Sequence, residues 1–209
     1  MCKLEKAAKL KFLKISLGAL CSFFFICGTA NSAEGSSDPV FQIKPQFFRA
    51  FSFSEGLAHV RVGDYQNGKC GFIDKTGRFA VTPLFDSCDS FSEGLAAVRV
   101  GDESLGKWGY IDKQGRFAIP PQFVRNDLIS LNPAKQFKEG FAAVHIGDDK
   151  TGQWGFIDKK GAFVINPQFS LADDFHEGVA VVKIGRGDSG RWRYVKKTGT
   201  FLTNQIYEC

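Results

Sequence analysis

Residues 91–115 read Phe-Ser-Glu-Gly-Leu-Ala-Ala-Val-Arg-Val-Gly-Asp-Glu-Ser-Leu-Gly-Lys-Trp-Gly-Tyr-Ile-Asp-Lys-Gln-Gly, and with its close copies this phrase occurs four times in the chain. The copies begin at Phe53, Phe91, Phe137 and Phe175, so successive copies are 38, 46 and 38 residues apart. A fixed period of this length indicates a stacked or ring-like repeat architecture, in which each unit buries its apolar face against its neighbours. A residue type that recurs in every copy is better explained by a structural role than by a catalytic one.

Each copy predicts three short strands joined by tight turns. In copy two the strands are 95–100, 107–112 and 116–119, which are rich in β-branched, small and aromatic residues. Asp112 opens a four-residue turn before the third strand and Gly115 closes it, as in a hairpin with a type I turn. The equivalent segments are 57–62, 69–74 and 78–82 in copy one, 141–146, 153–158 and 162–165 in copy three, and 179–184, 191–196 and 200–202 in copy four.

These features predict an all-β chain, a tandem array of about four three-stranded antiparallel β-meander repeats. Segment 41–47 matches 117–123 and 163–169, so we expect it to be an orphan third strand, for a total of about 13 strands. The pattern is compatible with an open stack and with a closed, propeller-like ring. The repeat domain is expected to cover 34–209, with repeats at about 53–90, 91–136, 137–174 and 175–209.

The first 33 residues have the order of a secretory signal peptide. Five Lys precede an apolar stretch over 15–27, and small residues follow it up to Ala33. We expect cleavage after Ala30, Ser32 or Ala33, and a secreted or periplasmic location; an uncleaved anchor is the alternative. Without this segment the chain carries 22 basic and 21 acidic residues. No clustered basic face suggests a nucleic-acid partner, and no membrane partner is expected after cleavage.

The phrase Lys107-Trp-Gly-Tyr-Ile-Asp112, preceded by Phe91-Ser-Glu-Gly-Leu-Ala-Ala-Val98, resembles the bacterial WG-containing repeat, also called the KWG repeat. The likeness covers essentially all of the chain after the leader. Copy one departs from the pattern because Cys70 stands where Trp is expected, and copy four because Arg193 replaces the Gly. The resemblance implies an exported binding or scaffold module, and it carries over no catalytic residue.

The residues that define the repeat are interpreted as structural. Alternation along a strand places Trp108 and Tyr110 on one face and Gly109 on the other, where the missing side chain leaves a gap for a neighbouring side chain. The same role is expected at Trp154, Gly155 and Trp192. Buried Trp side chains would favour a protein partner, whereas exposed rows of Trp or Tyr would favour stacking against glycan rings.

Cysteines suggest one cross-link. Cys70 occupies the slot of Trp108, and Cys88 occupies the slot of Ala172, 18 residues further along the chain. Export to an oxidising compartment permits a bridge that replaces the lost Trp packing. Its geometry requires Cα atoms within about 7 Å, so the segment after the third strand must fold back. Two buried thiols, or pairing of either residue with Cys209, are the alternatives.

Two exposed-looking segments are candidate binding elements. The extra residues of copy two lie within 124–136 and include Asp127, Leu128, Ile129 and Leu131, and such insertions often form the binding face of a repeat protein. A tolerated loop that packs locally explains them equally well. The tripeptide Arg186-Gly187-Asp188 falls at a hairpin tip of copy four and has the form of an integrin-type ligand.

No feature of the sequence predicts chemistry. The recurring Glu and Asp residues occupy near-identical settings, whereas acid–base catalysis needs a pair in different environments. His59, His145 and His176 have no ligand spacing, and the acidic loops are too short for a calcium site, so no metal or cofactor is expected. The sequence favours an exported, non-enzymatic module that binds a protein or a cell-envelope polymer. A secreted glycan-binding protein is the alternative, and a hydrolase the more remote one.

Overall fold

The computed structural model describes residues 46–124, 132–147 and 151–202. Contacts divide the chain into Met1–Pro39, which lies outside the described residues, and Val40–Cys209. The predicted signal peptide and nearly all of the predicted orphan strand at 41–47 also lie outside them. No helix in the described ranges has the length and apolar character that a membrane crossing needs.

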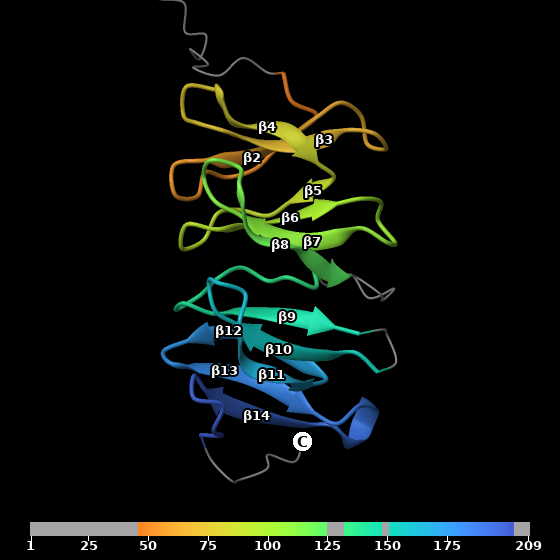
Figure 1. Ribbon diagram of the computed structural model, residues 1–209, viewed down its shortest axis with the longest axis vertical. Helices are drawn as coiled ribbons and strands as arrows, with labels where there is room; N and C mark the ends of the chain where they lie inside the picture. Colours follow the sequence, from red (N-terminus) through yellow and green to blue (C-terminus); the bar gives the residue numbers. More distant parts are fainter. Residues whose placement is uncertain (1–45, 125–131, 148–150, 203–209) are drawn as a thin grey trace, which may run out of the picture. The chain divides into compact units, whose positions relative to one another are not determined.

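Four small antiparallel sheets follow one another in chain order (Figure 1). The first holds β1 (Arg49–Ala50), β2 (Ala58–Val62), β3 (Lys69–Ile73) and β4 (Phe79–Phe85), and the second holds β5 (Ser87–Cys88), β6 (Ala96–Val100), β7 (Lys107–Ile111) and β8 (Phe117–Val124). The third holds β9 (Ala142–Ile146), β10 (Gln153–Ile157) and β11 (Phe163–Phe169), and the fourth β12 (Leu171–His176), β13 (Val179–Ile184) and β14 (Arg191–Lys196). The all-β tandem array is confirmed. Within the described residues no strand pairing joins the last sheet to the first, so no closed ring forms.

Three of the four sheets begin with a leading strand that the sequence pattern did not predict. β1 and β5 contain two residues each, and β12, with six residues, occupies the same place in the fourth sheet. In the third sheet a single bridge from Ala134 to Val144 replaces it. β1 and β5 are too short to display an alternating pattern, so their pairing is visible only once the chain is folded.

The third strand of each complete copy is longer than predicted. β8 continues past Ile119 through two prolines to Val124, with irregular register against β7. The reason is Gly109: a Cβ there would lie 2.6 Å from the carbonyl oxygen of Ile119 and 2.8 Å from the nitrogen of Pro121. The gap at Gly109 is therefore filled by the main chain of β8, which corrects the expectation of a side chain. Gly155 admits β11 in the same way, at 2.7 Å from the carbonyl oxygen of Ile165.

Copy four departs at the glycine position. Arg193 stands in the place of Gly109, and its guanidinium carbon lies 5.0 Å from the ring centre of Phe201. Of the predicted strand at 200–202, the structure has one isolated bridge between Val195 and Phe201, and the residues that follow 202 lie outside the described ranges.

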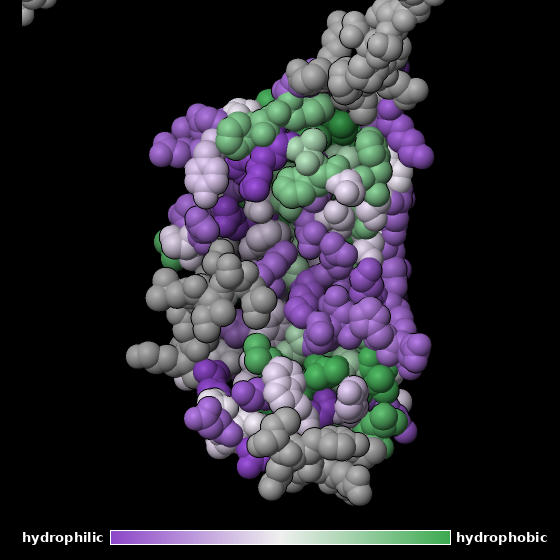
Figure 2. Space-filling model, turned by 180° about the vertical axis from the view of Figure 1, so that it is seen from behind, coloured by the Kyte–Doolittle hydropathy of each residue, from purple (hydrophilic) through white to green (hydrophobic). Residues whose placement is uncertain are grey.

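The core lies between successive sheets. Tyr110 and Phe123 of the second sheet pack with Phe137 and Val144 of the third in one buried cluster. Corresponding clusters join the first sheet to the second and the third to the fourth. Burying each large apolar side chain contributes about 1.5–3 kcal/mol, so each copy depends on its neighbour for stability. Figure 2 shows apolar surface gathered over the first sheet and again towards the last, with hydrophilic surface between.

Candidate functional site

The Glu-Gly corner that recurs in every copy is a two-residue turn with an uncommon backbone. Glu55 and Gly56 have φ angles of 52° and 89°, and Ser54 and Leu57 exchange two backbone hydrogen bonds across them. Positive φ at both central residues defines a type I′ turn, which favours Asn-Gly over Glu-Gly. A left-handed conformation costs a residue other than Gly about 1–2 kcal/mol, so a compensating contact of the Glu side chain is expected.

That contact links each copy to the next. The Oε2 atom of Glu55 accepts the backbone N–H of Gly94, one copy further along, at 3.0 Å. The Nζ atom of Lys113, in the same following copy, lies 3.2 Å from this oxygen. Burial acts to raise the pKa of Glu55, but the hydrogen bonds from Lys113 and Gly94 outweigh it and hold the pKa below its ordinary value. The later contacts of the same kind are Glu93 with Gly140 and Lys159, and Glu139 with Gly178 and Lys197.

The recurring turn aspartates are also occupied by structural contacts. Oδ1 of Asp112 accepts the backbone N–H groups of Gln114 and Arg116 at 2.9 and 3.0 Å. Asp74 and Asp158 cap their turns in the same way. The repeated carboxylates thus close turns and join copies, as their recurrence indicated.

The repeat-defining tryptophans fall into two groups. Trp108 and Trp154 are 6% and 5% exposed, and each packs with the next leading strand, Trp108 near Ala134 and Trp154 near Ala172. Trp192 is 43% exposed in the last sheet, with the Nζ atom of Lys183 5.7 Å from its ring centre. The two internal tryptophans therefore join sheets, whereas the last one has no following sheet among the described residues.

Copy one joins its sheets covalently. Cys70 of β3 and Cys88 of β5 form a disulfide with a Cα–Cα distance of 6.0 Å. β5 belongs to the second sheet, so the bridge occupies the place that Trp108 and Ala134 hold one copy later. The fold-back that the bridge required is the leading strand β5.

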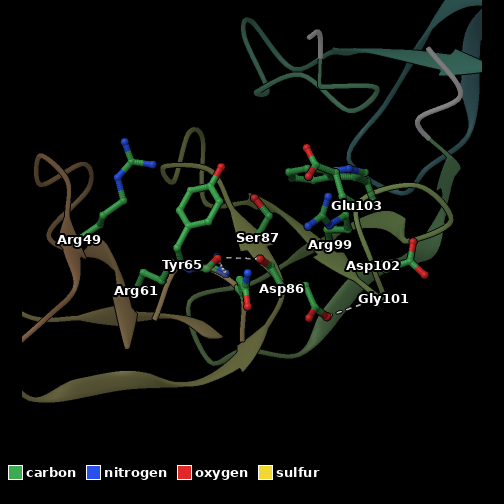
Figure 3. A pocket seen from close by; sticks show the side chains of 11 residues that line it. Arg49, Arg61, Tyr65, Asp86, Ser87, Arg99, Gly101, Asp102 and Glu103 are labelled. Atoms are coloured by element: carbon green, nitrogen blue, oxygen red, sulfur yellow. Dashed lines mark hydrogen bonds between the residues drawn. The ribbon is translucent and has the colours of Figure 1, made fainter. Parts of the chain in front are cut away.

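A polar cleft of about 560 Å³ opens where the first two sheets meet, beside their first hairpin loops (Figure 3). Arg49 and Tyr65 stand on the side of the first sheet, and Arg99 and Glu103 on the side of the second. Sequence reasoning missed this cleft, because its residues come from loops and leading strands that vary between copies. The signal that could have found it is the excess of basic residues at one strand position, Arg61, Arg99, His145 and Lys183.

The floor of the cleft is held rigidly. The guanidinium of Arg61 donates to the carbonyl oxygens of Asp64, Tyr65 and Asp86 at 3.1–3.3 Å. Oδ2 of Asp86 accepts the N–H of Gly101 at 2.9 Å and its other oxygen pairs with Lys69. Burial acts to raise the pKa of Asp86, but the contacts with Lys69 and Gly101 outweigh it and lower the pKa. These ties fix the two loops on either side of the cleft.

One buried hydrogen-bond donor beside the cleft is unused. Trp108 lines the cleft, and its buried Nε1 atom has no hydrogen-bond partner within the described parts of the chain. An indole N–H can only donate, and a buried donor without a partner costs about 1–3 kcal/mol. The Trp108 ring thus forms part of the wall while its N–H stays buried, and Arg49 and Tyr65 are exposed at the edge of the cleft.

A serine–histidine pair is the arrangement closest to an enzyme site. Ser90 Oγ lies 3.4 Å from His59 Nδ1, and burial lowers the pKa of His59. The neighbouring Asp89 directs its Oδ1 to the N–H of Ser90 at 2.7 Å and to Gln136 at 2.8 Å. Phe51 stacks on the imidazole with ring centres 3.9 Å apart. In a catalytic triad a carboxylate holds the histidine, whereas Asp89 Oδ1 here accepts from Ser90 and Gln136.

The remaining candidates have mixed outcomes. Asp127, Leu128, Ile129 and Leu131 of the insertion lie outside the described residues. Near the end of segment 124–136, Pro133 O accepts the N–H of His145 at 2.8 Å as part of the leading edge of the third sheet. Arg186 donates to the carbonyl oxygen of Gly152 at 2.6 Å, so its guanidinium is anchored to the adjacent hairpin. Within the described ranges no three His, Cys, Asp or Glu side chains gather as a metal site.

The model of the WG containing repeat family matches residues 43–65, 71–103, 108–148 and 154–187, which together exceed half of the chain. The chain belongs to this family. No curated protein matches it. Its two complete Trp-Gly pairs, at 108–109 and 154–155, show what the WG dipeptide does: the Trp joins one sheet to the next, and the Gly admits the third strand.

Proposed function

We propose that this WG repeat protein is an exported, non-enzymatic binding module that holds an extended segment of a partner protein in the cleft between its first two sheets. The polar cleft between the first two sheets, with Arg49 and Tyr65 exposed at its edge, is the observation that carries this proposal. Arg49 would favour an acidic side chain in the bound segment.

Burial of the internal tryptophans supports a protein partner over a glycan. Sugar-binding surfaces present aromatic faces for stacking, but Trp108 and Trp154 present at most their edges. Exposed Tyr65 and Trp192 are the observations that favour the second candidate, a glycan-binding protein. For a secreted or periplasmic location, the support is the leader sequence together with the disulfide between Cys70 and Cys88.

Selection from a random-peptide display library tests the proposal. We expect the purified protein to enrich extended peptides that contain Asp or Glu, and expect Trp108→Phe to weaken their binding because the smaller ring reshapes the wall of the cleft. Arg49→Glu should weaken binding of acidic peptides by at least as much. Trp154→Phe is the matched control, since this residue lies in the equivalent strand of the third sheet and does not line the cleft.

The same variants separate the candidates. Enrichment of peptides that Trp108→Phe and Trp154→Phe bind equally well would contradict use of the cleft. Binding to an array of envelope glycans without any peptide enrichment would favour the glycan-binding candidate instead. Failure to enrich either class would reject a binding role for this surface.

A further inference from the structure

At each end of the array, one side of the junction that joins consecutive copies is present without the other side. Each internal junction contains a Glu that reaches forward, a backbone N–H and a Lys that receive it, and a pair of aromatic rings. The rings are Phe72 with Phe91, Tyr110 with Phe137, and Phe156 with Phe175, with centres 4.7–4.9 Å apart. Because the junction has a donating side and a receiving side, the first copy presents one and the last copy the other.

The last copy presents the forward-reaching half. Glu177 has the same left-handed backbone as the earlier corner glutamates, with a φ angle of 52°. Its carboxylate has no partner among the described residues, whereas Glu139 one copy earlier binds Gly178 and Lys197. Tyr194 occupies the place of Tyr110 but is 43% exposed, while Tyr110 is fully buried.

The first copy presents the receiving half. Gly56 and Lys75 correspond to Gly94 and Lys113, and neither the Gly56 N–H nor the Lys75 ammonium has a partner in the described part of the chain. Phe53 is 42% exposed, although the equivalent Phe91, Phe137 and Phe175 are at most 1% exposed. The apolar surface over the first sheet is visible in Figure 2.

We infer that the last copy of one molecule docks on the first copy of another, with Glu177 received by Gly56 and Lys75 and Tyr194 seated against Phe53. The occupant is a second copy of this chain, because the two end faces match in charge and in ring position the interface that the molecule already makes three times. A head-to-tail contact of this kind is heterologous, so it extends into a linear assembly unless its rotation closes a ring. The inference does not depend on the cleft.

One difference makes the contact weaker than the first two internal junctions. These junctions contain hydroxyl links, Ser54 Oγ to Phe91 O at 2.7 Å and Ser92 Oγ to Phe137 O at 2.6 Å, whereas Lys138 and His176 take the serine position in copies three and four. A reversible, concentration-dependent assembly is expected rather than a permanent one.

Sedimentation velocity tests the inference. The chain is purified in the form in which the host processes it and is measured at protein concentrations from about 5 µM to about 500 µM. The sedimentation coefficient should rise with concentration. Glu177→Lys and Lys75→Glu should each weaken association by at least about tenfold, because each places like charges at the junction. Mixing the two variants should restore it, since the two reversed charges would then face each other at one junction and the native Glu177 and Lys75 would meet at the next.

The control is Lys160→Glu, a charge reversal in the turn of copy three that makes no ion pair in the described residues. It should associate like the unmodified chain, and circular dichroism should show that all variants fold. A chain that sediments as a monomer at every concentration would overturn the inference. So would association that survives both single reversals, or that the mixture fails to restore.

Discussion

The two inner copies and the two outer copies differ at the same strand. β7 and β10 of the inner copies carry the complete Trp-Gly pair, whereas β3 of copy one has Cys70 for the Trp and β14 of copy four has Arg193 for the Gly. The first departure replaces the packing of a Trp by a disulfide, and the second places a side chain at the glycine position. The difference teaches that the Trp and the Gly have separable roles, because copy one keeps the close approach of its third strand at Gly71 without the Trp.

Among the changes that test this comparison, removing the disulfide should cause the largest loss of stability. Cys70→Ser with Cys88→Ser should lower the free energy of unfolding by about 3 kcal/mol, because the bridge closes a loop of 18 residues. Replacing the same pair by Trp and Ala, the residues of the inner copies, should recover part of the loss. Urea unfolding measures both. If the Trp and Ala pair recovers nothing, the bridge does not substitute for tryptophan packing.

Adding a methyl group at an inner glycine should cause the next largest loss of stability. Gly155→Ala should destabilise the fold by about 1–3 kcal/mol, because the new Cβ would meet the main chain of β11 at 2.7 Å and a backbone cannot move aside cheaply. Arg193→Ala in copy four should cost about 1 kcal/mol or less, the value of its contact with Phe201. Equal losses in thermal melts would argue against the close approach as the reason for the glycine.

Neutralising the corner glutamates should give a smaller difference in stability between the inner and the outer copies. Glu139→Gln should lower the Tm, because the amide loses the ion pair with Lys197, whereas Glu177→Gln should leave the Tm of the dilute protein unchanged. The hydrogen bond from Lys197 lowers the pKa of Glu139, so its stabilisation is complete above the ordinary carboxyl pKa and is lost as the pH falls through the lowered value. The Tm difference between Glu139→Gln and the unmodified chain should therefore vanish in acid.

The smallest effect is expected at Asp174, which takes the position held by Gln136 one copy earlier. Gln136 donates to Asp89 at 2.8 Å, but Oδ1 of Asp174 is buried without a hydrogen-bond partner among the described residues. Burial raises the pKa of Asp174, so the charged form destabilises the fold above the ordinary carboxyl pKa. Asp174→Asn should raise stability at neutral pH by less than about 1 kcal/mol. A lower Tm in this variant at neutral pH would show that the negative charge of Asp174 stabilises the fold.

The sequence predicted the parts of the fold that repeat. The period indicated the four units, the turns at Asp112 and its equivalents indicated the second hairpin, and the shared departures at Cys70 and Cys88 pointed to the pairing now seen. The leading strands β1 and β5 escaped prediction because two residues carry no periodicity. The role of Gly109 was misassigned because a gap in a strand says nothing about whether main chain or side chain fills it.

The cleft was beyond sequence reasoning for a different reason. Arg49, Tyr65 and Trp108 come from three separate elements, and no spacing in the chain brings them together. Only Trp108 was singled out, and its burial agrees with its interpretation as a packing residue. A residue that repeats can thus join two sheets and also form part of the wall of a cleft.

The position of the disulfide also sets a mechanical polarity. Because the bridge clamps the first two sheets, and the described parts of the last two sheets hold no such bridge, a chain pulled from its ends should unravel from the last copy towards the first. The segment between Cys70 and Cys88, which are 18 residues apart, would stay out of reach of the load and withhold about 60 Å of contour length. Under tension the protein would then unfold one copy at a time and keep its cross-linked end folded the longest.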